Sequence, residues 1–227
     1  MITYPIAEIF VSPQGEGLYT GVLMTFVRLA GCSVGKKFPR SRYTDPKNPL
    51  PVYTEQCTLY DGRTFECDTN YRKKEQITSQ QIIERIPNAV KHVCITGGEP
   101  LIHDLSDLIH HLLSQSISIH LETSGTINIL PSLDWLMRNQ IWITVSPKYN
   151  CLPEMIRRAN EIKLLVDKDF DVTKLPEGVT NHRLVYIQPV NYENLINYEN
   201  IKLCLELQKN YPNWRISTQM HKIWHVR

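Results

Sequence analysis

The sequence predicts an α/β fold, a reduced (partial) β/α barrel of about six parallel strands, in one domain that spans residues 1–227. Apolar runs rich in β-branched residues recur along the chain, and segments with helical periodicity separate several of them. The near-continuous hydrophobicity of these runs indicates strands that are buried on both faces. A length of 227 residues with 42% hydrophobic content suits one sizeable core.

The predicted elements alternate along the chain. Strands are predicted to begin at Val22, His92, Ile117, Ile141, Glu161 and Arg183. Helices are predicted with Thr78 or Ser79 as N-cap, and from Asp104, Pro131 and Asn200. In such barrels the functional residues gather at the carboxyl ends of the strands.

Residues 33–56 interrupt the alternation, because prolines and basic residues crowd a stretch with little apolar periodicity. We predict a long loop there, within an insertion at about residues 33–66. Loops of that length are uncommon in compact domains unless they have a function. We expect this one to cover a metal cluster or to meet a reductant.

The charge balance argues against some classes of partner. The chain has 25 Lys and Arg and 23 acidic residues, so a small polar metabolite is favoured over nucleic acid or a membrane surface. A nucleic-acid-binding module is the alternative that the basic loop suggests, but no aromatic residues interleave with its charges. Without a signal segment or a long apolar run, we expect a cytoplasmic protein.

Cys32 follows the first predicted strand, Cys67 follows the loop, and Cys57 lies between them. A 4Fe-4S cluster held by three cysteines leaves one iron open to the amino and carboxylate groups of S-adenosylmethionine. Burial of unrelated cysteines is one alternative. Zinc is another, although it prefers short C-x2-4-C spacings, and here 24 and then 9 residues intervene.

Polar motifs lie at the carboxyl ends of several predicted strands. The paired glycines of ITGGEPLI let the backbone approach a ligand, and Glu99 suits an ammonium group, unless the motif is a plain turn. Glu122 of HLETSG, with Ser146 and Lys148 of TVSPK, would lie at the same end of the barrel, at the carboxyl ends of the strands. The alternative is that these residues only cap helices or carry solvated charge.

Other polar residues lie before the first predicted strand, within it and in the C-terminal tail. The loop SPQGEG, residues 12–17, presents amide groups to a heterocycle or is only a turn. Arg28 in an apolar strand needs a partner, either a substrate carboxylate or an internal salt bridge. His221 is either structural or, with Gln188, reads the edge of a purine-like ring.

Eight motifs occur in the order found in the 7-carboxy-7-deazaguanine synthases, which the chain resembles from about residue 8 to residue 222: EIFVSPQGEG, FVRLAGC, CDT, CITGGEP, ETSGT, VSPK, IQP and WRISTQMHK. The resemblance implies a radical S-adenosylmethionine carbon-nitrogen lyase of the queuosine/7-deazapurine pathway. Its reaction would be ring contraction of 6-carboxy-5,6,7,8-tetrahydropterin to 7-carboxy-7-deazaguanine with loss of ammonia. It also implies a 4Fe-4S cluster, magnesium, a flavodoxin-type reductant and a homodimer. A protein-activating radical enzyme is the alternative, and the substrate-side motifs argue against it.

The resemblance also implies roles for individual residues. Cys32, Cys57 and Cys67 would be the cluster ligands, and Thr69 would contact magnesium. The substrate side would consist of Pro13, Gln14, Gly15, Arg28, Thr96, Gln188, Gln219, His221 and Arg227. The S-adenosylmethionine side would consist of Glu66, Asp68, Gly98, Glu99, Glu122, Ser146, Pro147 and Lys148. No catalytic residue is assigned beyond the cluster and the radical.

The spacing of Cys57 and Cys67 departs from the family pattern, which ends in C-x2-C rather than C-x9-C. The intervening segment places Asp61-Gly62 between residues that favour strands. We therefore predict a small hairpin that returns both sulfurs to one cluster. Cys94, Cys151 and Cys204 are expected to have no such role.

Overall fold

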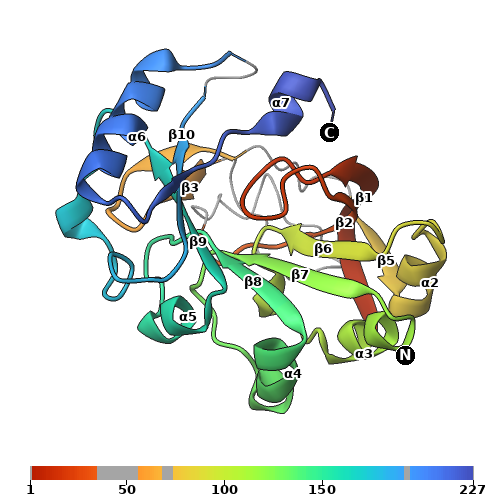
Figure 1. The fold of residues 1–227 in the computed structure, drawn as a ribbon. Coiled ribbons are helices and arrows are strands. Elements are labelled where there is room, and N and C mark those ends of the chain that lie inside the picture. Colours follow the sequence, from red (N-terminus) through yellow and green to blue (C-terminus); the bar gives the residue numbers. More distant parts are fainter. Residues whose placement is uncertain (1, 35–55, 68–73, 192–194, 227) are drawn as a thin grey trace, which may run out of the picture.

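The computed structural model describes residues 2–34, 56–67, 74–191 and 195–226 (Figure 1). These residues form a nine-stranded sheet with the order β11-β10-β9-β8-β7-β6-β2-β1-β5, and a separate two-stranded sheet, β3-β4. Of the predicted 33–66 insertion, residues 35–55 lie outside the described ranges.

The parallel part of the sheet confirms the predicted fold class. Its central strands run parallel in the order β2 (Leu23–Leu29), β6 (His92–Gly97), β7 (Ser118–Thr123), β8 (Ile141–Val145), β9 (Glu161–Val166) and β10 (Val185–Pro189). These are the six predicted strands. A short strand β11 (Arg215–Ile216) continues the parallel order at one edge.

Two antiparallel strands extend the other edge: β1 (Thr3–Pro13) pairs with β2, and β5 (Glu75–Thr78) pairs with β1. Nothing in the sequence pattern predicts β1, because Pro5 and Glu8 interrupt its apolar run and the strand is irregular between Ile6 and Glu8. Pairing on both sides stabilises it as a strand.

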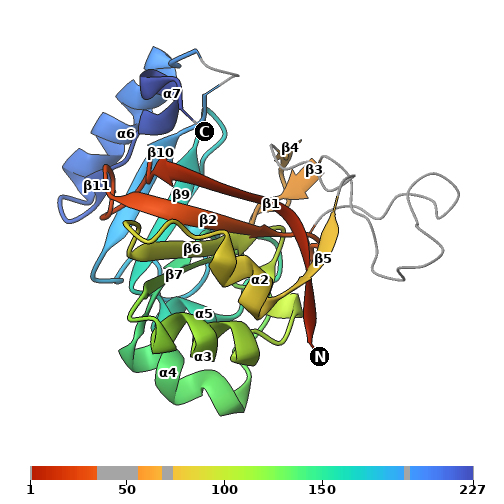
Figure 2. The same ribbon diagram turned by 90° about the vertical axis from the view of Figure 1, so that its right-hand side faces the viewer.

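Helices lie along the outer side of the curved sheet (Figures 1 and 2). They are α2 (Ser79–Glu84), α3 (Ser106–Ser114), α4 (Asp134–Asn139), α5 (Pro153–Arg158) and α6 (Tyr198–Asn210), with 3-10 turns at Pro100–Ile102, Pro131–Leu133 and Val172–Lys174. α2 begins with a capping box in which the Gln81 amide donates to Thr78 Oγ1 (3.2 Å), which confirms Thr78 as N-cap. No helix within the described ranges is long and apolar enough to cross a membrane.

The core lies between the sheet and these helices. Leu108, Ile109 and Leu112 of α3 are fully buried against strand residues such as Val27 and Ile95. This packing leaves the other face of the sheet for polar side chains, and the C-terminal helix α7 (Met220–Trp224) lies near the β1–β2 turn on that side (Figure 1).

The predicted hairpin between Cys57 and Cys67 is confirmed. β3 (Gln56–Thr58) and β4 (Thr64–Glu66) are antiparallel, and the Leu59 amide donates to the Arg63 carbonyl (2.8 Å) to close the turn. Gly62 has φ of +89°, which glycine adopts without strain.

Candidate functional site

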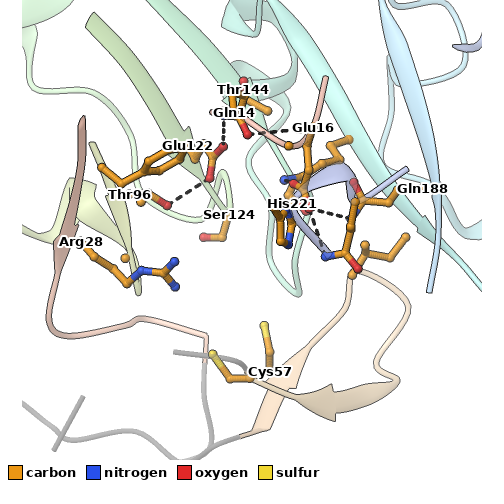
Figure 3. Close-up of a pocket in the computed structure, with 18 of the residues that line it drawn as sticks. Gln14, Glu16, Arg28, Cys57, Thr96, Glu122, Ser124, Thr144, Gln188 and His221 are labelled. Carbon is orange, nitrogen blue, oxygen red and sulfur yellow. Dashed lines mark hydrogen bonds and ion pairs between the residues drawn. The ribbon is translucent and has the colours of Figure 1, made fainter. Parts of the chain in front are cut away.

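The polar face of the sheet opens into a cavity of about 680 Å³ (Figure 3). Its walls come from the carboxyl ends of the parallel strands, the β1–β2 turn, the β3–β4 hairpin and α7. This volume is typical of sites for small molecules and cofactors.

The cavity brings together residues from both predicted sides of the site. Its lining includes the substrate-side residues Pro13, Gln14, Gly15, Arg28, Thr96, Gln188, Gln219 and His221. It also includes Gly98, Glu122, Ser146, Lys148, Cys32, Cys57 and Cys67. Pro147 is buried beside it, whereas Asp68, Thr69, Arg227 and the Glu66 side chain lie outside what the structure describes.

The three cysteines share one end of the cavity with Lys148. The Val34 amide donates to Cys32 Sγ (3.4 Å), and Lys148 Nζ donates to Ser146 Oγ (2.7 Å) and lies 5.8 Å from the centre of the Phe65 ring. Burial lowers the pKa of Lys148, and the nearby thiols of all three cysteines oppose that shift. Three sulfurs on one cavity, with an amide donor and a cation beside them, fit a 4Fe-4S cluster.

Glu99 is fully buried and is absent from the cavity lining. It accepts hydrogen bonds from the Leu101 amide (3.1 Å), Thr123 Oγ1 (2.7 Å) and the Ser124 amide (2.8 Å), and also from the Ser124 hydroxyl. Burial raises the pKa of Glu99, and these donors oppose the shift. Its carboxylate therefore connects the end of β6 to the end of β7.

Gly98 permits the close approach of that motif to Cys32. A Cβ atom at Gly98 would lie 1.9 Å from the Gly31 carbonyl oxygen and 2.9 Å from Cys32 Cβ. Any larger residue would displace the Gly31–Cys32 turn. The glycine thus sets the distance between the first cysteine and the wall of the cavity.

Glu122 accepts hydrogen bonds from Gln14 Nε2 (3.2 Å) and Thr96 Oγ1 (3.1 Å) (Figure 3). Both partners belong to the predicted substrate side, whereas the sequence placed Glu122 with S-adenosylmethionine. The carboxylate lies on β7, between β6 and the β1–β2 turn.

Glu16 and Lys163 form an ion pair inside the cavity that no sequence motif predicts. Gln188 Nε2 (3.0 Å) and Gln219 Nε2 (3.1 Å) donate to the same carboxylate. Burial alone would raise the pKa of Glu16, but Lys163 outweighs it and lowers the pKa to about 2. Burial alone would lower the pKa of Lys163, but Glu16 and Glu122 raise it. The available signal was a lysine inside the otherwise apolar run IKLLV.

The β1–β2 turn and α7 meet closely over the cavity. The Met220 amide donates to the Gly15 carbonyl (3.0 Å), and a Cβ atom at Gly15 would lie 2.2 Å from His221 Nδ1. The turn is also bonded to β9, because the Leu18 amide donates to Glu161 Oε2 (3.0 Å). Gly15 is thus required where these two segments touch.

Arg28 has an internal partner and also lines the cavity. Its guanidinium lies 3.8 Å from Glu8 and 5.5 Å from the centre of the Phe10 ring. The predicted salt bridge is therefore present. The carbonyl oxygen Oε1 of Gln188 is buried and accepts no hydrogen bond from the described residues, which makes it a candidate acceptor for a ligand.

Comparisons with known proteins give one consistent result, although no protein-family model matches the chain. A curated 7-carboxy-7-deazaguanine synthase from Buchnera aphidicola subsp. Schizaphis graminum is 35% identical over 234 residues, with 99% of each chain covered. Another from Escherichia coli (strain K12) is 34% identical, with 98% of this chain and 99% of the relative covered. The crystal structure of QueE from Escherichia coli matches with a TM-score of 0.67 and 33% identity, over 96% of this chain and 94% of that one.

Proposed function

The chain belongs to the 7-carboxy-7-deazaguanine synthase family, and we propose that its cavity holds the pterin substrate of that family beside a 4Fe-4S cluster and S-adenosylmethionine. It is a radical S-adenosylmethionine lyase that converts 6-carboxy-5,6,7,8-tetrahydropterin to 7-carboxy-7-deazaguanine in queuosine biosynthesis. One observation carries the site proposal: Cys32, Cys57 and Cys67 line the same cavity as the predicted substrate-side residues.

The pterin would bind over the polar face of the sheet. Its amino and ring N–H groups are hydrogen-bond donors. The carboxylates of Glu16 and Glu122 and the Gln188 side-chain carbonyl would accept these hydrogen bonds. A low pKa keeps Glu16 ionised at neutral pH, and bonds to a charged acceptor are stronger than neutral ones. Arg28 would bind the substrate carboxylate, since its guanidinium faces the cavity (Figure 3).

S-adenosylmethionine would bind at the end of the cavity that holds the cysteines. Lys148 and Ser146 suit its carboxylate, and the backbone at Gly97 and Gly98 suits its ammonium group. When bound, the cluster and S-adenosylmethionine supply the radical chemistry. Glu99, buried behind this wall, would position the motif without touching the ligand.

Further parts of the proposal rest on the family resemblance and on general chemistry. Magnesium would bind near Thr69, because a hard cation with few protein ligands keeps positions for water and substrate oxygens. Asp68, Glu66 and Arg227 would complete the site. A flavodoxin-type reductant would supply electrons, two copies of the chain would pair as a homodimer, and the thiol ligands suit the reducing cytoplasm.

Anaerobic reconstitution tests the function directly. The protein is incubated with 6-carboxytetrahydropterin, S-adenosylmethionine, magnesium and a strong reductant, and 7-carboxy-7-deazaguanine and 5′-deoxyadenosine are measured by mass spectrometry. Formation of both, dependent on each component, supports the proposal. 5′-Deoxyadenosine without the deazapurine would reject the substrate and favour a protein-activating enzyme, and neither product from a fully assembled cluster would reject the activity.

A further inference from the structure

We propose that Arg63 is a positioning residue for the metal cluster, because its ion pair with Asp167 holds the β3–β4 hairpin that carries Cys57 against the end of β9, and its ion pair with Asp61 holds the turn of that hairpin. The inference rests on the proposed function in one respect, since it takes Cys57 as a cluster ligand. It explains how a chain with nine residues between Cys57 and Cys67 can present both sulfurs to one metal centre.

The hairpin register places the two cysteines on one face. Cys57 of β3 lies directly opposite Phe65 of β4, and Cys67 follows Phe65 by two residues. Directly opposite residues share a face, as do residues two apart along a strand. Such diagonal neighbours are roughly 7–8 Å apart, close enough for one metal centre. Cys57, Phe65 and Cys67 all line the cavity, as this register requires.

Two strands of three residues do not hold such a register alone. An isolated two-stranded hairpin is at best marginally stable in water, so contacts with the rest of the protein must fix it. One such contact is the hydrogen bond from the Tyr149 amide to the Thr58 carbonyl (3.1 Å), and another is Leu59, which is buried. Both lie on the β3 side of the turn.

Arg63 supplies the contact on the β4 side. Its Nε donates to Asp61 Oδ2 (2.6 Å) within the turn, and its Nη1 forms an ion pair with Asp167, which directly follows β9. The Asp61 side chain is only 1% exposed, so loss of Arg63 would leave a buried carboxylate without its cation. The two aspartates raise the pKa of Arg63 against the opposing effect of burial, so the guanidinium stays charged.

The experiment compares cluster retention in four anaerobically reconstituted proteins: wild type, Arg63→Met, Asp167→Asn and the matched control Arg85→Met. Arg85 also forms two short bonds with a carboxylate, that of Glu75, but this pair is exposed and joins the C-cap of α2 to β5. Iron and sulfide per chain are measured, followed by the half-life of the cluster absorbance under an iron chelator. Thermal unfolding of the apo-proteins reports whether each variant folds.

We expect Arg63→Met and Asp167→Asn to lose the cluster on the order of tenfold faster than wild type, which corresponds to the lower end of the loss of metal affinity that follows removal of a residue supporting a metal ligand. Arg85→Met should match wild type. Unchanged half-lives in both hairpin variants, or an equal loss in Arg85→Met, would overturn the proposal. Asp167→Asn retains the Arg63–Asp61 pair, so it decides the question if Arg63→Met does not fold.

The readout also separates this inference from the proposed function. If wild type assembles the cluster but forms no 7-carboxy-7-deazaguanine, the function is rejected while the half-lives still decide the role of Arg63. If wild type forms the product and both hairpin variants retain the cluster, only the positioning role is rejected.

Discussion

Lys163 and Glu16 are 147 positions apart in the chain, and their side chains form an ion pair within the cavity. Glu16 lies in the β1–β2 turn and Lys163 in β9, so the pair links the turn to the central sheet. Gln188 and Gln219 donate to the same carboxylate, so residues from three further parts of the described chain bond to Glu16.

Replacing Lys163 with methionine should destabilise the apo-protein by about 3–5 kcal/mol, because Glu16 would remain buried without its cation. Urea unfolding measures this change. The folded-state pKa of Glu16, about 2, is below its ordinary value of 4.5, so the wild-type pair stabilises the fold above about pH 4.5 and loses that effect as the pH falls toward 2. The double variant Lys163→Met with Glu16→Gln should recover part of the loss; equal stability of the single variant and wild type would contradict the prediction.

Replacing Glu122 with glutamine should weaken pterin binding on the order of tenfold and leave S-adenosylmethionine binding unchanged, since the carboxylate is bonded to Gln14 and Thr96. Isothermal titration of the reconstituted protein with each ligand measures both effects. A selective loss of S-adenosylmethionine binding would instead return Glu122 to the cofactor side.

Replacing Cys57 with alanine should lower the iron and sulfide content to a minor fraction of wild type, because three thiolates are needed to hold the cluster. Cys204→Ala is the matched control, since Cys204 is buried in α6 and absent from the cavity lining. Iron analysis after anaerobic reconstitution compares them. Full iron content in Cys57→Ala would show that this thiol is not a ligand.

The unfolding free energy of the apo-protein should fall by about 2 kcal/mol between pH 7 and pH 5 through His120. Burial, with a smaller contribution from His92, lowers the pKa of His120 from 6.5 to about 4. The unfolded chain binds the proton more readily, so stability is full above about pH 6.5 and declines as the pH falls toward 4. His120→Phe should flatten this dependence in urea unfolding at the two pH values, and an unchanged slope would exclude His120 as its source.

The sequence predicted the parallel strands well because each is a nearly continuous apolar run, as in Val93 to Ile95 and Ile141 to Ile143. It did not predict β1, which depends on pairing with β2 and β5 rather than on its own pattern. Long-range pairing of this kind leaves no local signal.

The site residues, like the strands, were predicted where a local motif marks them and missed where distant contacts decide their role. Gln14, Arg28 and Cys57, to which the resemblance assigns binding roles, line the cavity. Lys163 was not predicted as a site residue, because its role depends on Glu16, which approaches from a distant turn. The buried position of the Glu99 side chain was not predicted either, because its hydrogen-bond donors Thr123 and Ser124 come from the next strand along the sheet and the residue after it. Side-chain partners across strands cannot be read from a single run of residues.

The bond between the Met220 amide and the Gly15 carbonyl has a consequence for folding. The cavity wall joins residues 13–16 to residues 219–226, two segments on opposite sides of the parallel strands in the sequence. Contacts between such distant segments carry a large loop-closure cost, so a partly folded chain can pair its strands and still lack one wall of the cavity. Retention of a ligand in this cavity would therefore report the complete native fold.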